Sequence, residues 1–185
     1  MTRTPAVNRE SLPEDQKIAY DAFVKQWGEA PTTGPASVML NAPEVALRGS
    51  ELARFLRTDP SLSPRIRELA MLFTARARDC VFIWNAHAPA GRAAGLSDAL
   101  IDSLRDKEAL RDLSADEAAV VNYAQELLGG NRMSQAAFDA ALAQFGPRGL
   151  VELNSLIGCY TMLALNLISF DVQLPDGVTE KPLPI

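Results

Sequence analysis

The spacing of the apolar residues constrains this chain more than any other feature. Between residues 13 and 173, almost every apolar stretch repeats at three- and four-residue intervals, as one face of an α-helix requires. No stretch alternates convincingly, as a half-buried strand would. The 185 residues suffice for one core with terminal extensions. The sequence therefore predicts an all-α fold: a single helical domain at 13–173, an N-terminal arm at 1–12 and an extended C-terminal tail at 174–185.

Start and stop signals divide this domain into seven to eight helices. Four serines that precede apolar runs are predicted N-caps, and Glu117 completes a capping box after the third of them (Ser63, Ser97, Ser114 and Ser134). Asn41 and Asp79 are the expected caps of two more helices, and residues 31–40 are expected to form a loop. The expected helices cover about 13–27, 43–57, 65–78 and 80–94, a short stretch after 97, and three segments ending near 129, 146 and 170.

Charge and composition exclude several classes of function. The net charge of −5 argues against nucleic acid as a main partner, because phosphate binding needs clustered Lys and Arg. No apolar run approaches the roughly 20 residues of a membrane span, and the first 15 residues lack a secretory apolar segment. We therefore expect a cytoplasmic protein with no membrane partner and with reduced cysteines.

Metal and cofactor motifs are absent from the sequence. The chain has one histidine and two widely separated cysteines, which do not form a zinc motif. It carries no phosphate-binding glycine loop, dinucleotide fingerprint or nucleophile elbow. We expect no metal and no cofactor, and a small molecule as the main ligand.

The residues with chemical potential lie in one stretch, 63–95. Cys80, Ile83, Trp84 and His87 have the spacing i, i+3, i+4, i+7, which places them on one side of a helix. Cys80 would fall in the first turn, where free backbone N–H groups favour a thiolate. His87 can exchange a proton near neutral pH. Glu68, on the preceding helix among apolar residues, would be desolvated unless it met a partner.

Structural explanations of the same residues are at least as common. A lone histidine on an apolar face is often a satisfied core residue. Glu68 could simply pair with Arg67 or Arg92, and a cysteine at a helix start is often a small hydrophobe. Trp84 could be core rather than a pocket wall.

The run RELAMLFTARARDCVFIWNAH, residues 67–87, resembles the signature of the carboxymuconolactone decarboxylase family. This family belongs to the superfamily of the alkylhydroperoxidase D-like proteins, and the similarity extends over about 13–177. It implies an alkylhydroperoxidase D-like helical bundle and a homo-oligomer, typically a trimer or hexamer. Its proton-transfer residues correspond here to Glu68 and His87, with Trp84 beside them.

Ile83 is the position where the chain departs from both branches. In the peroxidase branch the Cys-x-x-Cys pair maps onto Cys80 and Ile83, so the second thiol of a dithiol peroxidase is missing. Many decarboxylase relatives have a Glu at this position. The resulting pocket would carry fewer ionisable groups and suit a bulky apolar ligand. Cys159 could replace the second thiol only if the fold brought it beside Cys80.

Three functions stay open at this point. The first is a cofactor-independent lyase acting on a small carboxylated lactone or ring-cleavage metabolite of aromatic catabolism. In it His87 donates the proton, and Glu68 fixes the tautomer of His87 or relays the proton. Trp84 and Ile83 line the pocket, and Arg76 (or Arg67 or Arg78) binds a carboxylate. The second is a peroxidase-related thiol enzyme or redox sensor using Cys80. The third is a non-catalytic small-molecule binding or scaffold protein.

Overall fold

A computed structural model describes residues 2–130 and 132–185 and confirms the all-α prediction, with no strand in that part of the chain. Eight α-helices follow a short 3-10 helix, Arg9–Ser11, in the described residues. In chain order they are α1 (Glu14–Trp27), α2 (Pro35–Met39), α3 (Pro43–Thr58), α4 (Pro64–Ala77), α5 (Val81–Ala93), α6 (Asp98–Arg105), α7 (Ala115–Gly129) and α8 (Gln135–Ser169).

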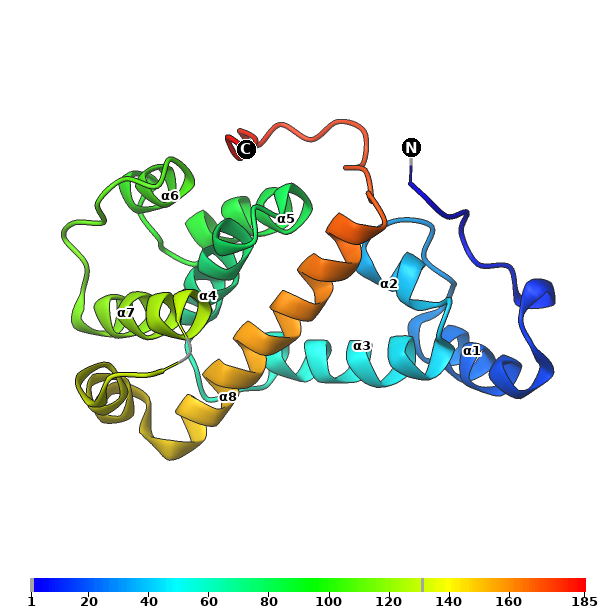
Figure 1. Ribbon diagram of the computed structural model, residues 1–185, viewed down its shortest axis with the longest axis horizontal. Helices are drawn as coiled ribbons and strands as arrows, with labels where there is room; N and C mark the ends of the chain where they lie inside the picture. The colour runs from blue at the N-terminus through cyan, green and yellow to red at the C-terminus, as the bar shows by residue number, and fades with distance from the viewer. Residues whose placement is uncertain (1, 131) are drawn as a thin grey trace.

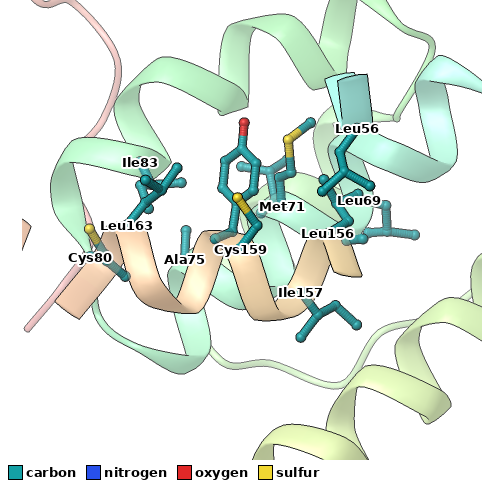
Figure 2. Close-up of a cluster of buried hydrophobic side chains, with 14 of the residues drawn as sticks. Leu56, Leu69, Met71, Ala75, Cys80, Ile83, Leu156, Ile157, Cys159 and Leu163 are labelled. Atoms are coloured by element: carbon teal, nitrogen blue, oxygen red, sulfur yellow. The ribbon is translucent and has the colours of Figure 1, made fainter. Parts of the chain in front are cut away.

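Helix α8 is the central element of the fold. It runs diagonally between α1–α3 on one side and α4–α7 on the other (Figure 1), and it contacts α2, α3, α4 and α7. Its apolar residues are buried against both sides, as the nearly continuous apolar sequence predicts. Figure 2 shows Leu156 of α8 gathered with Leu56 of α3 and Leu69 of α4 in this core.

The predicted break at Gly146 is present inside α8. Gly146 has φ 64° and ψ 176°, a conformation that is essentially restricted to glycine, and Pro147 follows it. The two helices expected on either side therefore meet at a kink. By length and composition α8 is the one described helix apolar enough to cross a membrane, although half of the tested window is buried. Core helices of globular proteins also meet these criteria.

The serine caps are confirmed. The hydroxyls of Ser63, Ser97 and Ser134 accept hydrogen bonds from the backbone N–H three residues on. Ser114 and Glu117 form the expected capping box at the start of α7. Each of these helices begins where its sequence signal places it, because the cap satisfies backbone donors that have no partner within the helix.

Three local predictions are wrong. Residues 31–40 contain α2 rather than only a loop, because Pro35 starts a turn and its apolar residues are buried. Asn41 does not cap α3: its side chain donates to the Val38 carbonyl at the end of α2, and Ala42 occupies the cap position. Asp79 does not cap α5, since Cys80 is the cap residue and Asp79 pairs with the Arg76 guanidinium.

The C-terminal tail is extended and lies against α4 and α5. Glu180 forms an ion pair with Arg92 of α5 at 2.6 Å. Near the end, an Arg76 nitrogen of α4 donates to the Pro184 carbonyl at 3.3 Å. Leu183 between them is only 4% exposed and joins the main core. One buried side chain and two polar contacts thus hold the tail to the helical body.

We expect Leu183→Ala to lower the free energy of unfolding by about 2 kcal/mol, the lower end for truncating a buried leucine, because a terminal segment can relax around the cavity. Ile185→Ala is the matched control: Ile185 is 86% exposed, so its truncation should change stability by less than about 0.5 kcal/mol. Urea denaturation of both variants measures the difference. Equal stabilities would show that the tail is not packed in solution.

Candidate functional site

Glu68 and His87 meet between two consecutive helices. Glu68 projects from α4 and His87 from α5, and the glutamate Oε2 lies 2.8 Å from the histidine Nδ1. Their side chains are 18% and 14% exposed. The helix pairing thus brings the one imidazole of the chain and a carboxylate into a shared, mostly enclosed position, as the sequence analysis expected.

This contact determines which histidine nitrogen is available for chemistry. An ionised carboxylate can only accept a hydrogen bond, so with Glu68 in that form Nδ1 carries the hydrogen and Glu68 accepts it. Nε2 then carries the lone pair of the neutral ring, and it forms no hydrogen bond to another residue that the structure describes. The glutamate also stabilises the imidazolium form once Nε2 takes a proton. The pair can therefore accept and return a proton at Nε2.

Tyr160 of α8 holds the other side of the imidazole. Its ring meets the His87 ring edge-on, with centroids 5.1 Å apart and an interplanar angle of 76°. Its buried hydroxyl has no hydrogen-bond partner, and burial raises the pKa of Tyr160 well above its usual value. Arg57 of α3 lies near this hydroxyl and partly opposes the rise, without reaching hydrogen-bonding geometry. Tyr160 stays protonated at physiological pH.

Cys80 is less reactive than its position at a helix start suggests. The thiol is buried, and burial raises its pKa. Backbone N–H groups of Ile83 and Phe82 act in the opposite direction but do not outweigh burial. The expectation of a favoured thiolate at this position is wrong, because it considered the helix end and not the apolar surroundings.

Cys159 does not pair with Cys80. Both are free thiols, and burial also raises the pKa of Cys159. In Figure 2, Cys80 lies beside Ile83 and Leu163, while Cys159 lies about one turn earlier along α8. In the described chain the two thiols are therefore unpaired and buried.

The remaining predicted site residues, Trp84, Ile83 and Arg76, are all buried. Trp84 and Ile83 are buried in the core, and the Trp84 Nε1 has no hydrogen-bond partner. Arg76 pairs with Asp79 and lines a cleft of about 540 Å³ among α4, α6 and α7. This cleft and four other clefts in the described residues are lined by neither His87 nor Glu68. The assignment of Arg76 and Trp84 to a substrate pocket stays a prediction.

Residues 43–126 match the sequence model of the Carboxymuconolactone decarboxylase family. This segment belongs to that family. It runs from α3 to α7 and contains Glu68, Cys80 and His87, whereas Tyr160 lies outside it. The match is shorter than the resemblance over 13–177, and α1, α2 and α8 lie outside it. Among curated proteins, none matches the chain.

Solved structures with the same fold align with nearly the whole chain. An uncharacterized peroxidase-related protein from Ralstonia eutropha JMP134, with an alkylhydroperoxidase AhpD core, has a TM-score of 0.70 at 14% identity and covers 95% of this chain and 93% of its own. A peroxidase-related protein from Silicibacter sp. TM1040 has a TM-score of 0.70 at 14% identity, covering 97% and 95%. The debrominase Bmp8, in a complex with 2,3,4-tribromopyrrole, has a TM-score of 0.69 at 11% identity, covering 95% and 93%. These likenesses establish an AhpD-like fold.

Sequence reasoning missed Tyr160, which packs on the His87 ring, and Arg57, which lies near the Tyr160 hydroxyl. Tyr160 lies 73 residues after His87, within a run of apolar residues that all indicate core. Arg57 is one of several exposed arginines near a helix end. No local spacing links either residue to His87. Tyr160 meets His87 only because α8 packs against the helices of residues 43–126.

We expect Cys80 to react slowly with alkylating reagents in the folded protein. The thiolate is the nucleophile, so a raised pKa leaves less of it at pH 8, and burial blocks access. The alkylation rate of Cys80 should be at least about 100-fold lower in the folded protein than in protein unfolded in urea, because the reaction in the folded state requires local opening. The rate should still rise above pH 8.5, the ordinary thiol pKa being about 8.5. Rapid alkylation that levels off below pH 7 would instead support a reactive Cys80.

Proposed function

We propose that the chain is a cofactor-independent enzyme that transfers a proton on a small carboxylated metabolite, a carboxy-lyase of lactones or ring-cleavage acids. The 2.8 Å contact between His87 Nδ1 and Glu68 Oε2 supports this most directly. It leaves Nε2 able to carry a proton to the substrate. A partly buried pair of this kind with an edge-on aromatic neighbour is pre-organised for general acid–base catalysis.

In the proposed decarboxylation, the bond between the substrate carbon and its carboxylate breaks and CO₂ leaves. The electron pair stays on the substrate as an enolate, conjugated with a neighbouring carbonyl. The His87 imidazolium then gives the Nε2 proton to that carbon, and the neutral ring takes another proton from water. Glu68 accepts the Nδ1 hydrogen bond throughout and favours the charged imidazolium.

The thiol alternative has less support. Cys80 is buried, its pKa is raised, and Ile83 replaces the thiol that a dithiol peroxidase needs. The binding or scaffold alternative requires a ligand site, and a cleft lined by Arg57, which lies near the Tyr160 hydroxyl, offers one. A ligand-binding role and the proposed proton transfer are therefore compatible.

Turnover in D₂O tests the proposal. Carboxylated lactones and ring-cleavage acids are incubated with the protein, and CO₂ and the deuterium content of the product are measured. We expect one solvent deuterium at the carbon that lost its carboxylate, and loss of this turnover in His87→Gln. CO₂ release that is equal in wild type and His87→Gln would contradict the assignment.

We further propose that the protein is a cytoplasmic homo-oligomer, a trimer or hexamer. Three exposed apolar side chains of α8, Val151, Leu165 and Ile168, lie on one face of the helix. Such a face is typical of a subunit contact. Sedimentation should give an assembly that Leu165→Glu weakens, whereas a monomer at every concentration would contradict the proposal.

A further inference from the structure

A cleft of about 390 Å³ opens among α1, α2, α3 and α8, away from the faces considered above. Its walls are mainly apolar: Phe23 and Trp27 of α1, Met39 of α2 and Leu163 of α8 line it. The Arg57 side chain of α3 lines it as well. The volume is in the range of sites for small organic ligands, which combine apolar walls with a few polar groups.

Two buried hydrogen-bond donors in or near this cleft have no acceptor within the described residues. The Trp27 Nε1 is buried and has no partner, and the Tyr160 hydroxyl, close to Arg57, has none either. Arg57 has no carboxylate partner among the described residues, unlike Arg54 one turn earlier, which lies 3.6 Å from Asp59. Glu29 also lines the cleft but forms no ion pair with Arg57 there.

Buried donors without partners are unfavourable, and they indicate that an acceptor is missing. A single group that accepts from a guanidinium and from nearby neutral donors is a carboxylate. The aromatic and thioether walls favour an aromatic or bulky apolar body attached to it. The cleft thus matches an amphipathic organic acid in both charge and shape.

We propose that this cleft binds an aromatic or bulky apolar carboxylate, with the carboxylate on Arg57 and the apolar body between Phe23, Trp27 and Met39. The binding inference depends on the cleft alone. The cleft would also serve as the entrance to the substrate site, with Tyr160 between Arg57 and His87. This second assignment rests on the proposed function. The Tyr160 hydroxyl lies by Arg57 while its ring packs on the imidazole.

Calorimetric titration of the full chain with 2-naphthoate tests the proposal, with 2-naphthamide as the uncharged match. We expect saturable binding of the acid and binding of the amide that is weaker by about 10- to 100-fold, the usual range for a charged hydrogen-bonded pair. Arg57→Gln should weaken binding of the acid by a similar factor. Arg54→Gln is the control on the same helix and should bind as wild type, since Arg54 does not line the cleft.

Fluorescence locates the ligand. The chain has two tryptophans, of which Trp84 is fully buried in the core and Trp27 lines the cleft. Naphthoate should change the emission of wild type, and this change should be lost in Trp27→Phe. No saturable binding of 2-naphthoate at millimolar concentration, equal affinity for acid and amide, or unchanged affinity in Arg57→Gln would each overturn the proposal.

The test separates this inference from the proposed function. Binding is measured without turnover, and His87→Gln should bind naphthoate as wild type does. If binding fails while a substrate is still turned over through His87, the cleft assignment is wrong and the chemistry stands. If binding holds and no carboxylate is turned over, the chemistry is wrong and the chain is a carboxylate-binding protein.

Discussion

Replacing His87 by glutamine should lower kcat of the proposed decarboxylation by about 10²- to 10⁴-fold, the usual contribution of a general acid or base. The glutamine amide can still donate a hydrogen bond to Glu68 and fill most of the imidazole space. It cannot take up or release a proton at neutral pH. The loss should therefore appear in kcat, while the free energy of unfolding changes by less than about 1.5 kcal/mol. Rapid-mixing or steady-state kinetics and urea denaturation of the same preparation measure both quantities.

Glu68→Gln separates orientation from charge at the same site. The glutamine carbonyl can accept the Nδ1 hydrogen bond that Glu68 accepts at 2.8 Å, so the ring keeps its position. The negative charge that stabilises the imidazolium is lost. We expect a fall in kcat smaller than that of His87→Gln, and a double variant no slower than His87→Gln alone, because the two residues act as one unit. Additive losses, or unchanged turnover in both single variants, would rule out this pairing.

The helices could be predicted from sequence because their signals are local. Ser63 and Ser134 each precede an apolar run, and a cap satisfies donors within three residues of itself. The kink at Gly146 was also predictable, since glycine followed by proline ends a helix. Helix α2 was not, because a five-residue helix has little preference of its own and forms where Val38 and Met39 are buried by other elements.

The same distinction between local signals and tertiary packing applies to the candidate site. The meeting of Glu68 and His87 could be predicted, since consecutive helices α4 and α5 pack together and both residues lie on predictable faces. The sign of the Cys80 pKa shift could not, because it depends on desolvation by neighbours distant in sequence. The positions of Tyr160 and Arg57 near His87 could not be predicted for the same reason. They depend on contacts between residues distant in sequence, which no local spacing indicates.

Trp84→Ala should lower the free energy of unfolding by about 3–5 kcal/mol, the range for removing a large buried aromatic side chain. Trp84 is fully buried in the main core and lines none of the five clefts found in the described residues. Trp84→Phe should cost much less, because phenylalanine refills most of the volume and removes an Nε1 donor that has no partner. Urea denaturation followed by circular dichroism gives both values.

The comparison decides between the two roles considered for this tryptophan. If Trp84 is core, stability falls in the order wild type, Trp84→Phe, Trp84→Ala, and Trp84→Phe keeps the KM of wild type for any carboxylate that is turned over. If it instead forms a substrate wall that opens in solution, Trp84→Phe raises KM while both variants stay within about 1 kcal/mol of wild-type stability. Should Trp84→Ala fail to fold, Trp84→Leu gives the same test with a smaller cavity. The complete burial of Trp84, which is 0% exposed, makes the first outcome the expected one.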